Sequence, residues 1–289
     1  MSVQEDFWRP FMECSSKPDH REPTQVHDPV HTIARPVSAA EVEDALSGMS
    51  DGAPGPDRVC HAMLRAVPRE DLAVHMSFWL ASRCPPSAFR QGITTLVPKS
   101  AEAKQPGEYR QIAVASIVAR LFHRVLALRC EEIPLSQMQK AFRRGDGLGH
   151  NVWTLRSILH ERTQRRKPIC VTFIDVAKAF DSVSHDSMVA AARRVGMPET
   201  VLEYLSSLYQ GSTTRLKVGQ SLSGEIVVGR GVRQGDLLSS PLRLFNYVLD
   251  WVLSDLDPQL GVQLEDNLRL NHLPFADDVA LVTESPRGA

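Results

Sequence analysis

Two adjacent aspartates near the end of the chain, Asp277 and Asp278, are the residues whose types and spacing point most directly to chemistry. They stand between two short apolar runs. An apolar run, an acidic break and a second apolar run predict a β-hairpin with the two aspartates at its tip, because Asp tolerates turn conformations. A third aspartate, Asp175, ends another apolar and β-branched segment, 171–175.

Carboxylates at strand ends can act together. A strand end in a sheet is rigid, so its side chain is held in place. Clustered carboxylates repel one another, and a divalent cation removes that cost. Mg²⁺ prefers a few carboxylates together with waters and substrate phosphates, and two such ions about 4 Å apart can activate an attacking hydroxyl and stabilise a leaving group. Any one of these aspartates alone is more simply a turn or strand-end residue.

The composition is that of an ordinary globular protein. The 289 residues are 43% apolar and 23% charged, and 33 Lys and Arg stand against 34 Asp and Glu. A strongly basic signature is missing, which disfavours a dedicated nucleic-acid-binding module but leaves room for a local basic groove. The five scattered cysteines include no Cys-x-x-Cys pair, so reduced, intracellular thiols are expected. No apolar run is long enough to span a membrane.

Hydrophobic periodicity predicts helices and strands without a regular alternation. Residues 1–36 carry five prolines and predict an extended or poorly ordered leader. Ser38 and Glu41 have capping-box spacing at the start of a helix. The predicted helices are 38–46, 59–66, 70–82, 116–130, 150–163, 185–195, 199–209 and 241–256; the predicted strands are 93–97, 169–175, 213–218, 224–229 and the two hairpin arms. This mixture favours an α+β fold with helices on one face of a largely antiparallel sheet.

Three segments in order resemble the palm motifs of reverse transcriptases of non-LTR retrotransposons. They are 173–181 (Phe-Ile-Asp-Val-Ala-Lys-Ala-Phe-Asp), 231–241 (Gly-Val-Arg-Gln-Gly-Asp-Leu-Leu-Ser-Ser-Pro) and 275–278 (Phe-Ala-Asp-Asp). Upstream, segments 51–57, 95–99 and 109–112 resemble the fingers motifs of the same family. The residues of these motifs are most similar to those of the site-specific elements that insert into ribosomal RNA genes.

The chain departs from the family pattern at two positions. Leu237 stands where a proline is usual in the second palm motif. Residues 110–112 are Arg-Gln-Ile, where the family usually has Arg-Pro-Ile, so Gln111 replaces the proline. The chain also stops shortly after Asp278. The thumb and the C-terminal endonuclease that the resemblance implies for a full-length parent are absent from this sequence, so we expect a fragment of a longer reading frame.

The resemblance implies a right-hand polymerase fold made of fingers and palm. Residues 37–168 would be mainly fingers. Residues 169–289 would be mainly palm, with an antiparallel sheet backed by helices, truncated after the Asp-Asp hairpin, and with the thumb absent.

The resemblance also implies catalytic and metal-binding roles. Asp175, Asp277 and Asp278 would bind two Mg²⁺ ions, with Mn²⁺ as an alternative. Phe180 would lie under the sugar of the incoming nucleotide, where a bulky ring excludes a 2′-hydroxyl; the alternative is an ordinary core aromatic.

Four further residues are implied to bind the nucleotide. Lys99 and Arg110 would hold the triphosphate, although ordinary surface solvation is the alternative. Gln234 would contact the nucleotide or the template, and Gly235 would permit close backbone approach. A basic set could follow a nucleic-acid backbone or simply be solvated helix ends: Arg143, Arg144, Arg162, Arg165, Arg166 and Lys167.

The implied activity is RNA-directed DNA polymerisation. The partners would be an RNA template, a DNA primer or target and deoxynucleoside triphosphates, with no membrane involved. The location would be intracellular, in the nucleus at the site of integration. Two alternatives stay open: a non-catalytic RNA-binding remnant, favoured by the missing thumb, and another two-metal enzyme such as a nuclease. The oligomeric state is not indicated.

Overall fold

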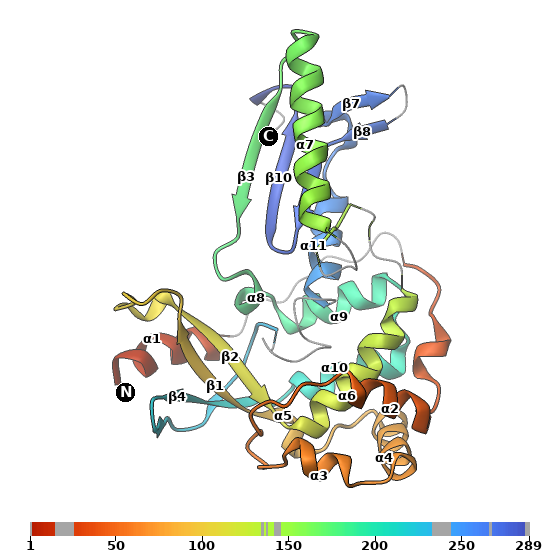
Figure 1. Ribbon diagram of the computed structural model, residues 1–289, viewed down its shortest axis with the longest axis vertical. Coiled ribbons are helices and arrows are strands. Elements are labelled where there is room, and N and C mark those ends of the chain that lie inside the picture. Colours follow the sequence, from red (N-terminus) through yellow and green to blue (C-terminus); the bar gives the residue numbers. More distant parts are fainter. Residues whose placement is uncertain are drawn as a thin grey trace. The chain divides into compact units, whose positions relative to one another are not determined.

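The chain folds into two compact units, each a mixture of helices and strands (Figure 1). The computed structural model describes residues 2–14, 26–133, 136, 138–141, 146–232, 244–265 and 268–286. Unit 1 combines Met1–Pro134 with Phe180–Phe245, and unit 2 combines Leu135–Ala179 with Asn246–Ala289. The mixed content agrees with the predicted α+β class. The units interleave along the sequence.

Unit 1 is mainly helical around one small sheet. Its helices are α1 (Ser2–Glu13), α2 (Ala39–Ser47), α3 (His61–Arg65), α4 (Arg69–Ser82), α5 (Ser87–Arg90), α6 (Ile117–Arg129), α8 (Ala179–Ser182), α9 (His185–Arg194) and α10 (Glu199–Tyr209), with 3₁₀ turns at His31–Ala34, Pro106–Glu108 and Cys130–Glu132. Its strands are β1 (Gln91–Pro98), β2 (Tyr109–Ala115), β4 (Thr213–Val218), β5 (Ser221–Leu222) and β6 (Ile226–Val227).

The sheet of unit 1 has the strand order β2-β1-β4-β5, with β6 also paired to β4. Strands β1 and β2 are antiparallel, whereas β1 and β4 are parallel. The other strand pairs of this sheet are antiparallel, so the sheet is largely antiparallel, as the sequence predicted. A parallel pair needs a long crossover connection, which the chain between β1 and β4 provides.

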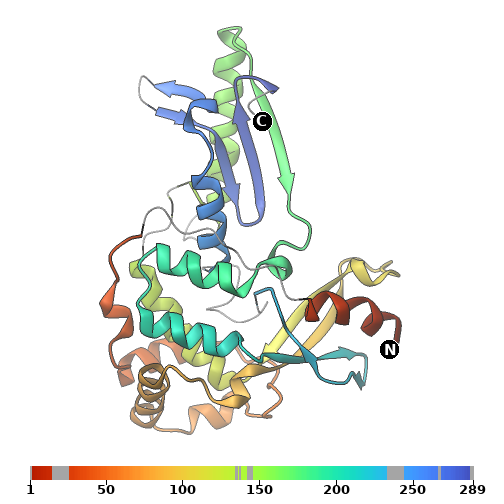
Figure 2. The ribbon, with the colours of Figure 1, turned by 180° about the vertical axis from the view of Figure 1, so that it is seen from behind.

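Helix α1 corrects the prediction of an extended leader at the start of the chain. Trp8 and Met12, one helical turn apart, are 1% and 6% exposed, and they pack against Leu216 and Ile226 of the unit 1 sheet. Leu216 lies in β4 and Ile226 in β6, and Figure 2 shows α1 beside this sheet. A spacing of four residues puts two large apolar side chains on one helix face. Their burial outweighs the backbone hydrogen bond lost at Pro10, which lies inside the helix.

Helix α2 begins as the sequence predicted. The Ser38 hydroxyl accepts a hydrogen bond from the Glu41 amide at 3.3 Å, and the Glu41 carboxylate accepts one from the Ser38 amide at 2.9 Å. This reciprocal capping box satisfies two of the amides that a helix start leaves without partners.

Glu41 also forms a buried ion pair that joins the N-terminal segment to α6. The Arg129 side chain is 3% exposed and donates to both Glu41 carboxylate oxygens, at 2.8 and 3.0 Å. It also donates to three backbone carbonyls of the segment before α2, those of Ile33, Arg35 and Pro36. The Arg129 guanidinium holds the pKa of the Glu41 carboxyl well below its usual range.

Unit 2 contains an antiparallel three-stranded sheet with the order β3-β10-β9, formed by β3 (Cys170–Asp175), β10 (Asp278–Thr283) and β9 (His272–Phe275). A second antiparallel pair joins β7 (Val262–Glu265) and β8 (Leu268–Leu270), and a 3₁₀ turn covers Pro258–Leu260. The long helix α7 (Gly147–Gln164) packs on β9, and α11 (Leu244–Ser254) belongs mostly to this unit. An antiparallel sheet with helices against it agrees with the sequence prediction.

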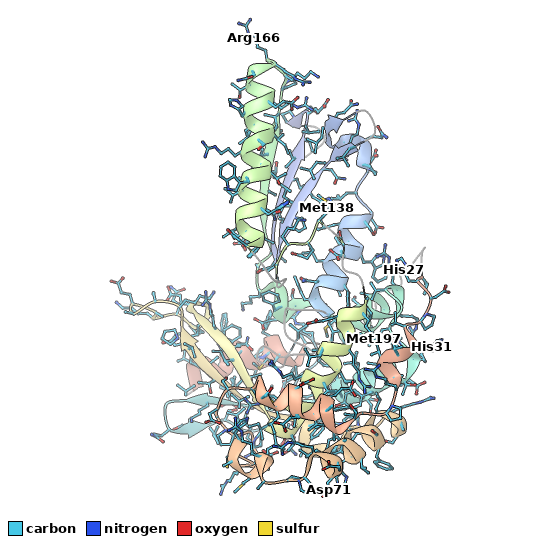
Figure 3. The ribbon with its side chains drawn as sticks, turned by 45° about the vertical axis from the view of Figure 1, so that its right-hand side comes forward. His27, His31, Asp71, Met138, Arg166 and Met197 are labelled. Atoms are coloured by element: carbon cyan, nitrogen blue, oxygen red, sulfur yellow. The ribbon has the colours of Figure 1, made fainter. Side chains whose placement is uncertain are left out.

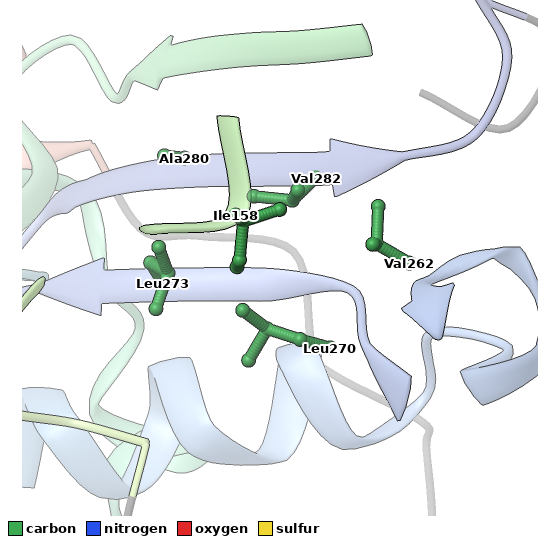
Figure 4. Close-up of a cluster of buried hydrophobic side chains, with 6 residues drawn as sticks. All are labelled: Ile158, Val262, Leu270, Leu273, Ala280 and Val282. Atoms are coloured by element: carbon green, nitrogen blue, oxygen red, sulfur yellow. The ribbon is translucent and has the colours of Figure 1, made fainter. Parts of the chain in front are cut away.

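The core of unit 2 lies between α7 and the strands. Figure 4 shows Ile158 of α7 lying against β9 and β10, beside Leu273 and Val282. Helix α7 starts earlier than predicted, because Asp146 caps it by accepting a hydrogen bond from the Gly149 amide at 2.8 Å. Among the described residues, no helix is long and apolar enough to cross a bilayer.

We predict that Arg129→Met destabilises unit 1 by about 3 kcal/mol, because it leaves Glu41 and three carbonyls without their buried partner. A urea titration measures this change. The matched control is Arg35→Met, which removes a 52% exposed guanidinium from the same carboxylate. That change should cost less than about 1 kcal/mol. Equal costs for the two variants would contradict the buried role of Arg129.

The same pair predicts an acid dependence of stability. A carboxyl whose folded-state pKa is depressed contributes stability at pH values above its unfolded pKa of about 4.3, and this contribution is lost as the pH falls towards the folded value. The free energy of unfolding should therefore drop more steeply below about pH 4.3 in the wild type than in Arg129→Met. Parallel slopes between pH 6 and pH 3 would show that Glu41 is not the group concerned.

Candidate active site

The three aspartates meet at one end of the β3-β10-β9 sheet. Phe275 pairs with Asp278 across the hairpin, so the turn consists of Ala276 and Asp277. Asp278 is the first residue of β10 and lies directly opposite Asp175, the last residue of β3. The hairpin is confirmed, but its tip is Ala276-Asp277 rather than the predicted Asp277-Asp278. Opposed residues of paired strands share a face of the sheet, so Asp175 and Asp278 do so.

The charges of Asp175 and Asp278 act on Asp277. The pKa of Asp277 is raised, first by burial and then by the negative charges of Asp278 and Asp175, while a backbone hydrogen bond acts in the opposite direction. Asp277 is half-buried, whereas Asp175 and Asp278 are exposed. The site therefore has a concentrated negative charge that a cation would offset.

The donor set fits a hard cation in kind but is not a finished ligand cage. Among the residues that the structure describes, no group of three or more His, Cys, Asp and Glu is arranged to hold a metal ion. Carboxylate oxygens are the ligands that Mg²⁺ prefers, and Mg²⁺ usually keeps several waters and substrate phosphates besides one or two carboxylates. The metal roles of Asp175, Asp277 and Asp278 stay predictions.

The turn itself has an unusual backbone. Ala276 has a φ of +56°, in the left-handed region that residues other than glycine disfavour. Two buried amides that the sequence analysis did not single out contact the hairpin backbone. The Gln139 side chain forms hydrogen bonds with the backbone of Ala276, and the Asn151 side chain donates one to the Pro274 carbonyl. No motif chemistry marks them in the sequence, because an amide in a loop or near a helix start is ordinary.

Phe180 lies in α8, beside the start of the second motif segment. Its ring packs edge-on against Phe245, with ring centroids 4.6 Å apart, and its carbonyl accepts a hydrogen bond from the Val232 amide at 2.7 Å. The Gly231 amide donates to the Val183 carbonyl at 2.7 Å. Phe180 is half-buried, so both the nucleotide-contacting role and the core role stay compatible with its position.

Lys99 and Arg110 lie on one hairpin of unit 1. Arg110 is opposite Val97, and the Lys99 amide continues the pairing by donating to the Glu108 carbonyl at 2.9 Å. Both side chains are exposed, and alternation along the strands puts them on the same face. The structure thus brings this predicted pair together.

The next residue along β2 faces the other way. Gln111 is 8% exposed and lines a pocket together with Thr94, Asp181 and Gly231, and its Nε2 has no hydrogen-bond partner among the described residues. Because neighbouring strand residues point to opposite faces, Arg110 faces away from this pocket. The pocket is also lined by Asp181, the residue after Phe180.

The remaining predicted residues divide into three groups. Gln234, Gly235, Arg143 and Arg144 lie outside the described residues. For Arg162 neither alternative, a nucleic-acid contact or a solvated helix end, is right, because its side chain is 3% exposed and donates to Glu284 at 2.8 Å. Arg162 lies on the face of α7 that packs into unit 2. Arg165, Arg166 and Lys167 are exposed, and Figure 3 shows Arg166 at the end of α7.

Residues 97–289 match the family described as "Reverse transcriptase (RNA-dependent DNA polymerase)". This match covers more than half of the chain and includes the three palm motif segments together with Lys99 and Arg110, whereas segment 51–57 lies before it. The chain belongs to the reverse transcriptase family.

Several relatives are polyproteins of R2 retrotransposable elements. A "Retrovirus-related Pol polyprotein from type-1 retrotransposable element R2" of Popillia japonica is 36% identical over 267 residues, covering 88% of this chain and 36% of that protein. The same description applies to a Nasonia vitripennis protein, 33% identical over 90% of this chain and 25% of that protein. The type-2 element R2DM protein of Drosophila melanogaster is 32% identical over 89% of this chain and 24% of that protein.

These relatives confirm the resemblance to reverse transcriptases of non-LTR retrotransposons. The chain spans between 24% and 36% of the length of these three relatives. A solved structure titled "Partial Cas6-RT-Cas1--Cas2 complex" aligns with 88% of this chain and 38% of that chain, at 17% identity and a TM-score of 0.40.

We predict that Gly231→Ala destabilises unit 1 more than Gly211→Ala does. Both glycines have positive φ values, +88° and +71°, so each substitution costs about 1 kcal/mol in backbone strain. A Cβ at Gly231 would also lie 2.9 Å from the Asp181 Cα and carbonyl oxygen, whereas a Cβ at Gly211 meets nothing within 4 Å. Gly231→Ala should therefore lose a further 1–3 kcal/mol or so in a urea titration. Similar losses would contradict the close approach to Asp181.

Proposed function

We propose that this chain carries the catalytic centre of an RNA-directed DNA polymerase. The observation that supports it most is the pairing of Asp278 with Asp175, with Asp277 in the adjoining turn, in a member of the reverse transcriptase family. In the proposed reaction the 3′-hydroxyl of a primer attacks the α-phosphate of a deoxynucleoside triphosphate on an RNA template. A new P–O ester bond forms, the bond to the β-phosphate breaks, pyrophosphate leaves and the hydroxyl proton passes to solvent.

Asp175, Asp277 and Asp278 would hold two Mg²⁺ ions, with Mn²⁺ as an alternative. Bound Mg²⁺ supplies charge neutralisation on the phosphates and lowers the pKa of a coordinated hydroxyl. The strand ends keep Asp175 and Asp278 in fixed register, which pre-organises the negative charge before substrate arrives. Positioning and electrostatics of this kind account for most of the rate in phosphoryl transfer.

The nucleotide would be bound by residues outside the carboxylate set. Phe180 would pack under the sugar and exclude a 2′-hydroxyl. Lys99 would act on the triphosphate as a point charge and Arg110 as a bidentate fork, from the exposed face of one hairpin. Gln234 and Gly235 would contact the base or template.

The domain division, the partners and the location are proposed from the family resemblance. Residues 37–168 would be mainly fingers and 169–289 mainly palm, with an RNA template, a DNA primer or target and deoxynucleoside triphosphates as partners. The protein would act inside the cell, in the nucleus at the site of integration.

Primer extension on an RNA template with Mg²⁺ tests the proposal. We predict that Asp277→Asn lowers incorporation by at least about 100-fold, because the variant keeps the shape of the side chain and removes its charge. The matched control is Asp255→Asn, an exposed aspartate of unit 2 outside the sheet end. This control should extend primers at the wild-type rate.

Equal extension by the wild type and Asp277→Asn would overturn the carboxylate assignment. If the wild type binds RNA but incorporates no nucleotide, the result would favour a non-catalytic RNA-binding remnant. Metal-dependent shortening of the primer or template, without extension, would favour a two-metal nuclease.

A further inference from the structure

We propose that Gln139 and Asn151 are positioning residues, which hold the turn of the β9-β10 hairpin in the conformation that directs Asp277. Neither residue touches a carboxylate of the site in the described contacts. Each acts through the backbone that carries Asp277. The activity measurement below rests on the proposed polymerase function, whereas the hydrogen-exchange measurement does not.

Gln139 pairs with both polar backbone groups of a single turn residue. Its side chain is fully buried. Its Nε2 donates to the Ala276 carbonyl at 3.4 Å, and its Oε1 accepts from the Ala276 amide at 3.2 Å. A primary amide offers a donor and an acceptor in one plane, so it can pair with the N–H and the C=O of one residue, much as a neighbouring strand does. An apolar side chain of the same length can make neither bond.

Ala276 needs this support for two reasons. Its φ of +56° is a left-handed conformation that a residue with a Cβ disfavours, so the turn would relax if nothing held it. The residue is also 8% exposed, so its amide and carbonyl have little access to water. Buried backbone groups of this kind must be paired, and Gln139 pairs both.

Asn151 holds the other side of Phe275. Its Nδ2 donates to the Pro274 carbonyl at 2.9 Å, and the residue is 8% exposed. Strand β9 lies at the edge of the three-stranded sheet, so its outer side has no strand partner within that sheet. The two amides therefore fix the backbone at positions 274 and 276, on both sides of the aromatic residue that precedes the turn.

The supports themselves are anchored in unit 2. Gln139 Oε1 also accepts from the Ala141 amide at 3.1 Å, and Met138, labelled in Figure 3, packs against the core cluster of the unit. Asn151 belongs to α7. Gly147, at the start of that helix, lies so close to the Lys140 carbonyl that no Cβ would fit. The loop that carries Gln139 and the helix that carries Asn151 are thus packed together, and they form one support for the turn.

The consequence for catalysis follows from the chain order. Asp277 directly follows Ala276, so a change in the Ala276 backbone angles swings the Asp277 carboxylate. A misplacement of about 1 Å in a reacting constellation can lower the rate about 100-fold without removing any catalytic group.

The test compares Gln139→Met with Gln139→Met combined with Ala276→Gly in primer extension. We expect kcat of the single variant to fall about 100-fold, with the KM for the nucleotide changed less than about threefold. Glycine adopts positive φ without steric cost, so the double variant should regain at least about tenfold of the lost kcat. A role of Gln139 in filling the core would not be rescued by a change at position 276. Gln164→Met, at an exposed position of α7, is the matched control and should behave as the wild type.

Hydrogen exchange of the Ala276 amide gives a second measurement that needs no activity. We expect this amide to exchange at least about tenfold faster in Gln139→Met, because it loses its acceptor. The Val282 amide, bonded to the Asn271 carbonyl at 2.8 Å in the same sheet, should stay protected and shows that unit 2 remains folded.

Unchanged exchange at Ala276, or a loss of kcat that Ala276→Gly does not recover, would overturn the proposal. If the wild type incorporates no nucleotide, the proposed polymerase function fails, and the exchange measurement alone decides whether Gln139 holds the turn.

Discussion

The register between β3 and β10 is the constraint on which the rest of the site depends. Six consecutive residue pairs, from Asp278 with Asp175 to Thr283 with Cys170, fix this register. Because side chains alternate between faces, a slip of one residue would move every side chain of a strand to the other face. The buried positions of β10, which include Ala280 and Val282, prevent that slip, since they must face α7. The apolar core of unit 2 thereby determines where the carboxylates lie.

The end of the same sheet carries two unfavourable features, which are electrostatic repulsion and backbone strain. Three carboxylates at a sheet end raise the electrostatic energy of the folded chain, and an alanine in a left-handed conformation adds backbone strain. The strained alanine and two of the three aspartates are consecutive residues, 276–278. Strain of this kind persists only where the surroundings determine the conformation, and the buried amide of Gln139 is the described group that pairs with the strained residue. Unit 1 meets a comparable requirement with Arg129, whose buried charge is paired with a carboxylate and with carbonyls.

The sequence was sufficient where a local pattern determines the structure. The alternation of apolar runs and aspartates predicted the hairpin and the strand before Asp175, and Ser38 with Glu41 predicted a helix start that the structure confirms. The sequence failed where distant packing decides. Arg162 has the composition of a solvated helix end, but it is buried because α7 turns that side towards Glu284 and the carbonyl of Gln263. Trp8 and Met12 are buried by strands about two hundred residues away, which no local count of prolines reveals.

The candidate site likewise contains residues that the sequence reveals and residues that only the structure reveals, and this difference has a physical reason. The three aspartates are charged and adjoin apolar strands, so their type and their neighbours are visible in the sequence. The residues that position them need only a donor and an acceptor at the right place, and any of several polar types can supply these. Gln139 lies 138 positions before Asp277 and is recognisable only after the hairpin has folded against it. Arg110 and Gln111 are adjacent in one motif segment, and only the strand pairing shows that Gln111 faces the pocket lined by Asp181 while Arg110 faces away from it.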